Sequence, residues 1–411
     1  MNKKQNFADR FLYYIIDNYL YWICIALILI VSLVIRIGFA PDVAHTSDYH
    51  DYLVPWVEAY RWLGARAGLA QNNITTYYIP YNTFLALVSN FNCEPWLPIA
   101  AVSIFFDYVI AFTTYGIVAL LRPEKKVKGL YPGAAFIASM TLFLPEMLFN
   151  SSLAKQCDSV YAAFALLGLY FLLKEKYGRA YFFLGIGFAF KLQALFLMPV
   201  FLLVYIAKRN HSVKYMLWVP AWYLIGGLPA ILCGADPIGV YKIYLDQTNG
   251  FGMISMNIPN IYKLGLTDYA LLESPGLWFT FAIFVAAGAY CYRHQEKIDR
   301  VMIYYLAGWC VWTCVEFLPD MHERYGFMAS VIIPVFMLVF NRKYLWSAVV
   351  LTFCTLFIYG YYVIEGNPFP LPVEAVAYTA AYLAVTVNIA RILNGKEMLS
   401  EAAEAGACNA D

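Results

Sequence analysis

Long, largely apolar stretches recur along this chain, and short basic clusters separate them. A helix that crosses a membrane needs roughly 20 largely apolar residues. Hydrophobic residues make up 62% of the 411 positions and charged residues only 13%, about half of the ~25% that is usual in soluble domains. We therefore predict an all-α polytopic membrane protein. The predicted spans are about 19–38, 97–121, 131–149, 158–173, 214–235, 276–292, 301–318, 326–340, 344–363 and 371–390.

The same composition excludes several other classes of protein. So few charged side chains cannot solvate the surface of an ordinary cytosolic enzyme, and the chain is too apolar to be disordered. Nine cysteines are sparse and odd in number, which excludes a secreted disulfide scaffold. A net charge of +1 gives no reason to expect nucleic acid as a partner.

The stretch 180–207 decides the topology. It is apolar except for Lys191 and Gln193 near its middle, so it could form one tilted span or two short ones. Basic residues favour cytoplasmic loops. The basic clusters all fall inside only if 180–207 crosses twice, or re-enters and returns, with Lys191 near the outer side, and 77–91 does not cross. The prediction is about twelve crossings (eleven to thirteen) with both termini in the cytoplasm.

This topology gives one membrane domain, 1–395, followed by a small acidic cytoplasmic tail, 396–411. Its long outer loops are about 40–96 and 236–275, and we expect short helices in the first. Nothing resembles a cleavable signal peptide. Because the polar material lies mostly on the outer face, we expect the chemistry there too.

In the first outer loop, Asp48 and Asp51 are three residues apart. In a helix, both carboxylates would share one face. Desolvation beside membrane and aromatic rings would suit one of them to act as a general base. The alternative is a solvated loop with two acids.

The second outer turn carries Lys155, Gln156 and Asp158 just before a predicted span. Taken alone, it reads as a helix start with an aspartate cap. Lys191 lies deep in an apolar stretch, where an ionisable residue is a functional candidate by default. The alternative for Lys191 is snorkelling to the interface.

Five ionisable groups crowd the short segment from Glu316 to Arg324. They could simply bridge one another. His322, Glu323 and Arg324 could instead bind a phosphate, with arginine as a bidentate fork. Within the predicted spans, Arg36 and Asp107 could pair or line a cavity. The segment 257–263 of the second loop could cover the site or be a plain loop.

Taken together and in this order, these segments resemble the GT-C superfamily of membrane glycosyltransferases, in particular bacterial members similar to the GPI-type mannosyltransferases. The resemblance covers residues 20 to about 340. It rests on these matches: Ser47-Asp48-Tyr49 with Pro55-Trp56, Tyr78-Ile79-Pro80-Tyr81, Gln156-x-Asp158-Ser159 with Tyr161, Lys191-x-Gln193 with Pro199, Asn257-x-Pro259-Asn260, and His322-Glu323-Arg324-Tyr325. Two departures stand out: Ala154-Lys155 replace a frequent Trp-Gly, and Tyr78-Ile79-Pro80-Tyr81 differs from the more usual Asn-x-Pro-Pro-Tyr type.

The resemblance implies a GT-C-like bundle and an inverting transfer of a hexose from a polyprenyl-phosphate sugar. The acceptor would be a lipid-linked or cell-envelope glycan at the outer face of a bacterial plasma membrane. Asp48 would be the base, with Asp51 as an additional acid. The remaining roles fall into two groups: Lys191, His322, Arg324 and Lys155 for the donor phosphate, and Gln156, Asp158, Gln193, Glu323, Tyr325, Trp56 and Asn260 for positioning the substrates.

Two questions stay open at the level of sequence. A divalent cation, Mg²⁺ or Mn²⁺, could sit between the acids and the phosphate. A lipid-linked glycan flippase is the main alternative function, because broken helices with charges at depth also occur in transporters. A non-catalytic subunit that binds a lipid-linked glycan is a third.

Overall fold

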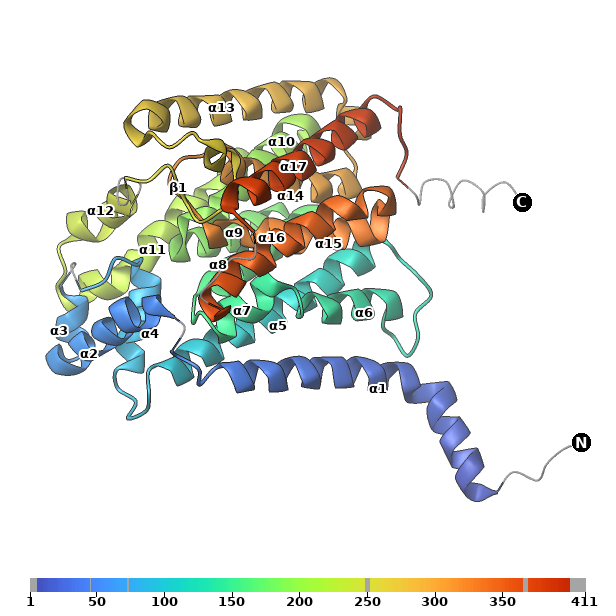
Figure 1. The fold of residues 1–411 in the computed structure, drawn as a ribbon, viewed down its shortest axis with the longest axis horizontal. Coiled ribbons are helices and arrows are strands. Elements are labelled where there is room, and N and C mark those ends of the chain that lie inside the picture. Colours follow the sequence, from blue (N-terminus) through green and yellow to red (C-terminus); the bar gives the residue numbers. More distant parts are fainter. Residues whose placement is uncertain (1–5, 45, 72–73, 248–251, 365–368, 400–411) are drawn as a thin grey trace, which may run out of the picture.

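The structure is a computed structural model, and it describes residues 6–44, 46–71, 74–247, 252–364 and 369–399. Helices dominate these ranges, and only two very short strands occur in them. The all-α prediction is therefore confirmed. Figure 1 shows most long helices running side by side, with α1 and α13 at opposite edges.

The first half of the described chain contains α1 (Phe7–Phe39), the π-helical turn η1 (Tyr49–Leu53), α2 (Val54–Leu63), α3 (Ala65–Leu69), α4 (Ile79–Val88), α5 (Trp96–Leu121), α6 (Pro132–Thr141), α7 (Pro145–Ser152), α8 (Asp158–Leu173) and α9 (Tyr177–Phe190). The second half contains η2 (Leu192–Leu197), α10 (Met198–Lys208), η3 (Val213–Leu217), α11 (Trp218–Cys233), α12 (Pro237–Gln247), β1 (Ser255–Met256), η4 (Ile261–Leu264), α13 (Tyr269–Arg293), η5 (Gln295–Lys297), α14 (Arg300–Phe317), β2 (Met321–His322), η6 (Glu323–Gly326), α15 (Phe327–Phe340), η7 (Arg342–Tyr344), α16 (Leu345–Ile364) and α17 (Leu371–Leu393).

Seven helical segments among the described residues are long and apolar enough to cross a membrane, or eight if one bent pair counts as a span. This supports a multi-pass membrane protein, while the count of about twelve crossings stays a prediction. The seven are Phe7–Phe39, Trp96–Leu121, Val213–Cys233, Tyr269–Arg293, Glu323–Phe340, Arg342–Gly360 and Leu371–Leu393.

The predicted span 131–149 is not one straight helix. It forms α6 and α7, whose axes are bent by 51°. Pro145 begins α7, and a proline disfavours helical backbone at the residue before it. Arg36 Nη2 donates to two backbone oxygens around this break, Leu142 O at 2.8 Å and Met147 O at 3.1 Å. The bond to Leu142, the residue after α6, satisfies a carbonyl group that a continuous helix would have bonded internally.

The stretch 180–207 is not one continuous helix, and the break lies at its polar residues. α9 ends at Phe190, Lys191 is extended with φ −158° and ψ 137°, and a 3-10 turn precedes α10. The segment 77–91 contains only the ten-residue α4, too short to span a bilayer. The expected short helices of the first loop are also present, as η1 and α2 to α4.

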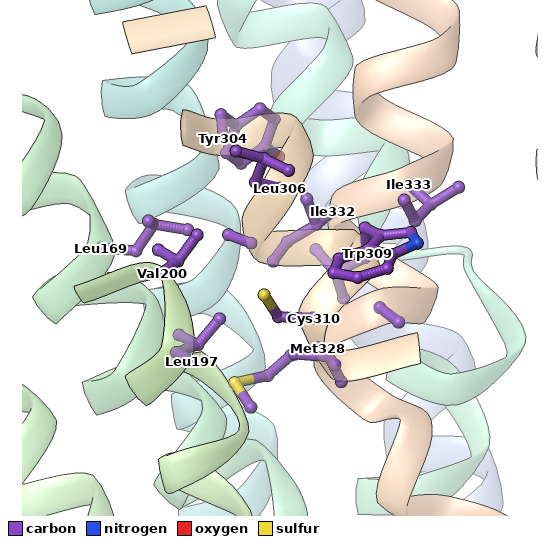
Figure 2. Close-up of a cluster of buried hydrophobic side chains, with 14 of the residues drawn as sticks. Leu169, Leu197, Val200, Tyr304, Leu306, Trp309, Cys310, Met328, Ile332 and Ile333 are labelled. Carbon is purple, nitrogen blue, oxygen red and sulfur yellow. The ribbon is translucent and has the colours of Figure 1, made fainter. Parts of the chain in front are cut away.

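The core lies where α8, α10, α14 and α15 meet. Every residue of α14 from Met302 to Phe317 is buried, and Figure 2 shows Leu169, Val200, Cys310 and Met328 from these helices directed toward one another. α8 and α9 approach closely at Gly168, where an added Cβ would lie 3.0 Å from Ala180 O. Small residues allow such approach between membrane helices.

The ends of α5 mark two ends of the bundle. At its start, Trp96 N donates to Tyr49 Oη at 3.1 Å, so the first loop lies beside it. With 26 residues and a rise of ~1.5 Å each, α5 is about 39 Å long. Figure 1 shows α2 to α4 and α12 at one end, and the α5–α6 connection at the other.

Candidate functional site

Four segments that lie far apart in the sequence converge at the α2–α4 end. Gln156 Nε2 donates to Asp48 Oδ2 at 2.6 Å. Lys191 Nζ forms an ion pair with Asp158 Oδ1. Arg324 Nη1 lies 3.3 Å from Asp48 Oδ2. The polar residues singled out in the first loop, the second turn, the α9–α10 break and the segment after α14 thus form one connected cluster.

A small pocket opens onto this cluster. Its lining residues come from three of the four segments and from α16: Thr46, Ser47, Asp48, Leu153, Ala154, Gln156, Glu323, Arg324 and Tyr359. The Asp48 side chain is 36% exposed and that of Arg324 is 12% exposed. A carboxylate and a guanidinium are therefore both reachable from the pocket.

Arg324 is the centre of the charge arrangement. Its Nη1 contacts Glu323 Oε1 at 3.1 Å as well as Asp48, and its Nε lies 3.5 Å from Asp158 Oδ2. A guanidinium presents five donors in a planar fork, so one side chain can hold three carboxylates and retain N–H groups for an anion.

Asp48 keeps one carboxylate oxygen available. Gln156 and Arg324 both approach Oδ2, and among the described residues none bonds Oδ1. Gln156 is held in turn by Tyr77, whose Oη donates to Gln156 Oε1 at 3.0 Å. Burial raises the pKa of Tyr77 well above its usual range, so the phenol remains a donor. The arrangement orients Asp48 and leaves Oδ1 able to accept a proton.

Asp158 is not a helix cap. It is the first residue of α8, and the side chain before it makes no capping bond. Both Asp158 oxygens have other partners: Oδ1 pairs with Lys191, and Oδ2 accepts from Asn150 Nδ2 at 3.0 Å. Lys191 is buried, so it does not snorkel; it contacts the pocket only through Asp158 and Arg324.

His322 and Tyr325 flank the arginine without lining the pocket. His322 Nδ1 lies 2.6 Å from Glu323 Oε2, and Lys191 Nζ lies 5.2 Å from the Tyr325 ring centroid. Glu316 and Asp320 lie apart from the cluster, because Glu316 accepts from Thr379 and Asp320 from Tyr269. Part of the acidic segment is therefore structural.

Lys155 does not reach the pocket. Its Nζ donates to Leu153 O at 3.0 Å and to Asp42 O, and the residue is fully buried. Burial lowers the pKa of Lys155 to about 8. The φ of Lys155 is 53°, in the region that favours glycine. The family resemblance expects a glycine at this position. The expected phosphate contact is replaced by a tether between the second turn and the first loop.

Four other predicted site residues lie outside the pocket. Asp51 is exposed in the π-helical turn, whose wider turn separates residues three apart, so it does not share the face of Asp48. Trp56 packs on Tyr77 with ring centroids 5.1 Å apart. Gln193 is buried on η2, and Asn260 Nδ2 donates to Val315 O at 2.9 Å.

A buried polar chain behind the pocket was not predicted from the sequence. Asn150 Nδ2 donates to Tyr359 Oη at 2.9 Å, and Tyr359 Oη donates to Glu146 Oε1 at 2.8 Å. Glu146 carried a usable signal, because it is an acid within a predicted span. Tyr359 carried none, since tyrosine is frequent throughout this chain.

The second outer loop reaches the cluster through backbone pairing. β1 runs parallel to β2, with Ser255 opposite Met321 and Met256 opposite His322. Asn257, with φ 57°, forms a further bridge to His322. The first residue of 257–263 thus adjoins His322, while coverage of the site by this segment stays a prediction.

The donor set does not form a ready metal site. Among the described residues, no three His, Cys, Asp or Glu side chains gather closely enough to hold a metal ion. Asp158 and Glu323 have both oxygens engaged, by Lys191 and Asn150 in one case and by His322 and Arg324 in the other. We therefore derive no step through a metal.

No protein-family model and no curated protein matches this chain.

Proposed function

We propose that the protein is an inverting glycosyltransferase. It moves a hexose from a polyprenyl-phosphate sugar to a lipid-linked or cell-envelope glycan at the outer face of the membrane. The observation that carries the proposal is the pocket in which the half-exposed Asp48 lies 3.3 Å from Arg324. This pairs a base for an acceptor hydroxyl with a cation for a phosphate leaving group.

The reaction needs one proton acceptor and one stabilised leaving group. Asp48 Oδ1 takes the proton of the acceptor hydroxyl as its oxygen attacks the anomeric carbon. The bond from that carbon to the phosphate oxygen breaks, and the electron pair leaves with the polyprenyl phosphate. Because the new bond forms opposite the departing one, the anomeric configuration inverts.

Arg324 supplies the positive charge at the leaving group. A fixed guanidinium in a partly buried pocket stabilises developing negative charge without reorganising. Asp158 and Glu323 hold it in place, and Lys191 balances Asp158. In this proposal Lys191 and His322 act on the phosphate through Arg324 and Glu323 rather than by direct contact.

The membrane setting suits a lipid-linked donor. Seven described helical segments are long and apolar enough to span a bilayer, and the pocket lies at the end of the bundle where the first loop packs. A polyprenyl chain would lie among the spans while its sugar phosphate reaches Arg324. The proposed location is a bacterial plasma membrane with the site outside.

A transfer assay with purified protein in lipid vesicles tests the proposal. Radiolabelled polyprenyl-phosphate hexoses are supplied with membrane extract as acceptor, with and without a chelator. Asp48→Asn should lower the transfer rate by about 10²–10⁴-fold, the usual contribution of a general base. Glu58→Gln, on the exposed face of α2, is the matched control and should keep the wild-type rate.

The same assay separates the rival functions. Donor that crosses the vesicle bilayer without transfer would establish the flippase instead. Binding of a lipid-linked glycan with neither transfer nor crossing would establish an assembly subunit. Transfer that persists in Asp48→Asn would refute the site.

A further inference from the structure

The connection between α5 and α6 forms a compact basic and apolar turn. Val127 N donates to Leu130 O at 2.9 Å, and Leu130 N donates back to Val127 O at 3.2 Å. Lys128 and Gly129 between them have φ of 49° and 85°, which closes a tight turn. The Val127 and Leu130 side chains are nevertheless 43% and 46% exposed. A fixed turn therefore presents two apolar side chains outward.

An apolar groove lies beside this turn. It is shallow and open, and it is lined by Tyr21 of α1, Val127, and Pro132, Gly133 and Phe136 of α6. Tyr21 Oη donates to Pro132 O and fastens α1 to α6 there. Figure 1 shows the N-terminal part of α1 turning away from the bundle near this connection. The groove is thus built between two elements and opens to the outside of the bundle.

Positive charge lies next to the groove in the sequence. Arg122, Lys125, Lys126 and Lys128 fall within seven residues at the end of α5. The one acid among them, Glu124, is engaged: its Oε1 accepts from Gly133 N at 2.6 Å and Ala134 N at 3.2 Å. Its carboxylate is held at the start of α6, and four basic residues against this one acid leave the segment with an excess of positive charge.

Aromatic rings hold two of the lysines near the groove. Lys128 Nζ lies 3.2 Å from the centroid of the Tyr19 ring on α1, and Lys126 Nζ lies 5.0 Å from that of Tyr131. Tyrosine and lysine together are typical of the level of lipid headgroups. The apolar groove then continues from this level toward the hydrocarbon core.

The position of this turn along the bundle is also consistent with the level of the lipid headgroups. The turn follows the last residue of α5, while the candidate site lies beside its first residues. The length of α5, about 39 Å, is close to the ~40–45 Å of a whole bilayer with its headgroups. The groove and the candidate site therefore lie at opposite membrane faces.

We propose that this groove binds one anionic phospholipid. The headgroup phosphate contacts Lys125, Lys126 and Lys128, and an acyl chain lies along Val127 and Phe136. Basic clusters next to a spanning helix attract anionic lipids. The adjoining apolar groove selects a lipid over a soluble anion, because a soluble anion gains nothing from apolar walls. The site is independent of the proposed transfer reaction.

Native mass spectrometry of the whole protein in detergent tests this. The protein is incubated with equal amounts of phosphatidylglycerol and phosphatidylcholine, and the retained lipids are counted at rising salt. Wild type should retain phosphatidylglycerol preferentially, and salt should weaken this preference. The triple variant Lys125→Gln/Lys126→Gln/Lys128→Gln should lose it by roughly tenfold or more.

Two further variants sharpen the result. Val127→Asp keeps all the lysines and makes the groove wall polar and acidic, so it should also lose phosphatidylglycerol. Lys174→Gln/Lys176→Gln/Arg179→Gln removes three basic residues after α8, at the same end of the bundle, and should keep the preference. Only variants whose thermal unfolding temperature matches that of wild type are compared.

Three results would overturn the proposal. Wild type could retain both lipids equally, or the Lys125/Lys126/Lys128 variant could match wild type. If Val127→Asp keeps the wild-type preference while the lysine variant loses it, the attraction is a diffuse surface effect and no groove site exists.

Discussion

Arg324 Nη1 lies 3.3 Å from Asp48 Oδ2, which ties the segment after α14 to the first outer loop. The same guanidinium reaches Asp158 and Glu323, so a single side chain organises acids from three segments. Because Asp48 keeps Oδ1 open beside it, the pair can handle a proton and a negative charge in one pocket.

Arg324→Lys tests whether the fork geometry matters. An ammonium is a point donor, so lysine cannot hold Asp48, Asp158 and Glu323 together as arginine does. We expect kcat for sugar transfer to fall by about 10²–10³-fold, as when one preorganised charge stabiliser is lost. Arg66→Lys, in the exposed part of α3, should leave kcat unchanged. A rate for Arg324→Lys equal to wild type would show that positive charge alone suffices.

Asp48 and Asp51 should respond differently to the same change. Asp48 lines the pocket and accepts from Gln156, whereas Asp51 is exposed in the π-helical turn. We expect Asp51→Asn to transfer sugar at close to the wild-type rate under conditions where Asp48→Asn is inactive. Initial rates of the two variants, purified in parallel, make the comparison. Inactivity of Asp51→Asn would require the first loop to rearrange when substrate binds.

Lys155 should make stability depend on pH. Its folded-state pKa is lowered from 10.5 to about 8, so the folded state disfavours the charged form. Below about pH 8 that cost is fully present, and it shrinks as pH rises toward 10.5. Between pH 7 and 9.5 the free energy of unfolding should gain about 2 kcal/mol from this group. The gain should vanish in Lys155→Met, as measured by thermal unfolding in detergent at pH 7 and at pH 9.5. An identical pH dependence in the variant would refute the assignment.

Much of the architecture followed from the sequence because membrane helices obey a simple length and polarity rule. The break at Lys191 was predictable for the same reason: an unpaired charge inside an apolar stretch needs a polar partner, here Asp158. The bend between α6 and α7 was not predicted, although Pro145 is a signal for it, because the stretch 131–149 carries no charged residue except Glu146 and is apolar enough for one span.

The site itself was predictable only in part. The short motifs and their order along the chain predicted four site residues that the structure places in contact: Asp48, Gln156, Asp158 and Arg324. Whether a polar side chain faces the pocket or a backbone group depends on the rotation of its helix and on loop packing, which composition does not encode. Lys155 therefore turned out to bond carbonyl groups.

Arg36 and Asp107 form a fully buried ion pair between α1 and α5, with Nε 3.0 Å from Oδ2, which confirms one of the two arrangements expected for them. Removing one partner leaves a buried charge without compensation, which typically costs about 3–5 kcal/mol. We expect Asp107→Leu to lower the thermal unfolding temperature strongly, because Ser151 Oγ also loses the shorter of its two acceptor contacts. Arg36→Met should do the same, since the Leu142 carbonyl at the α6–α7 break loses its side-chain donor.

The double variant Arg36→Met/Asp107→Leu should be more stable than the sum of the single losses predicts, because neither charge is then left alone. Thermal unfolding of all four proteins in one detergent gives the coupling energy. Strictly additive losses would mean that the carbonyl and hydroxyl contacts, rather than the ion pair, hold α1 against the bundle.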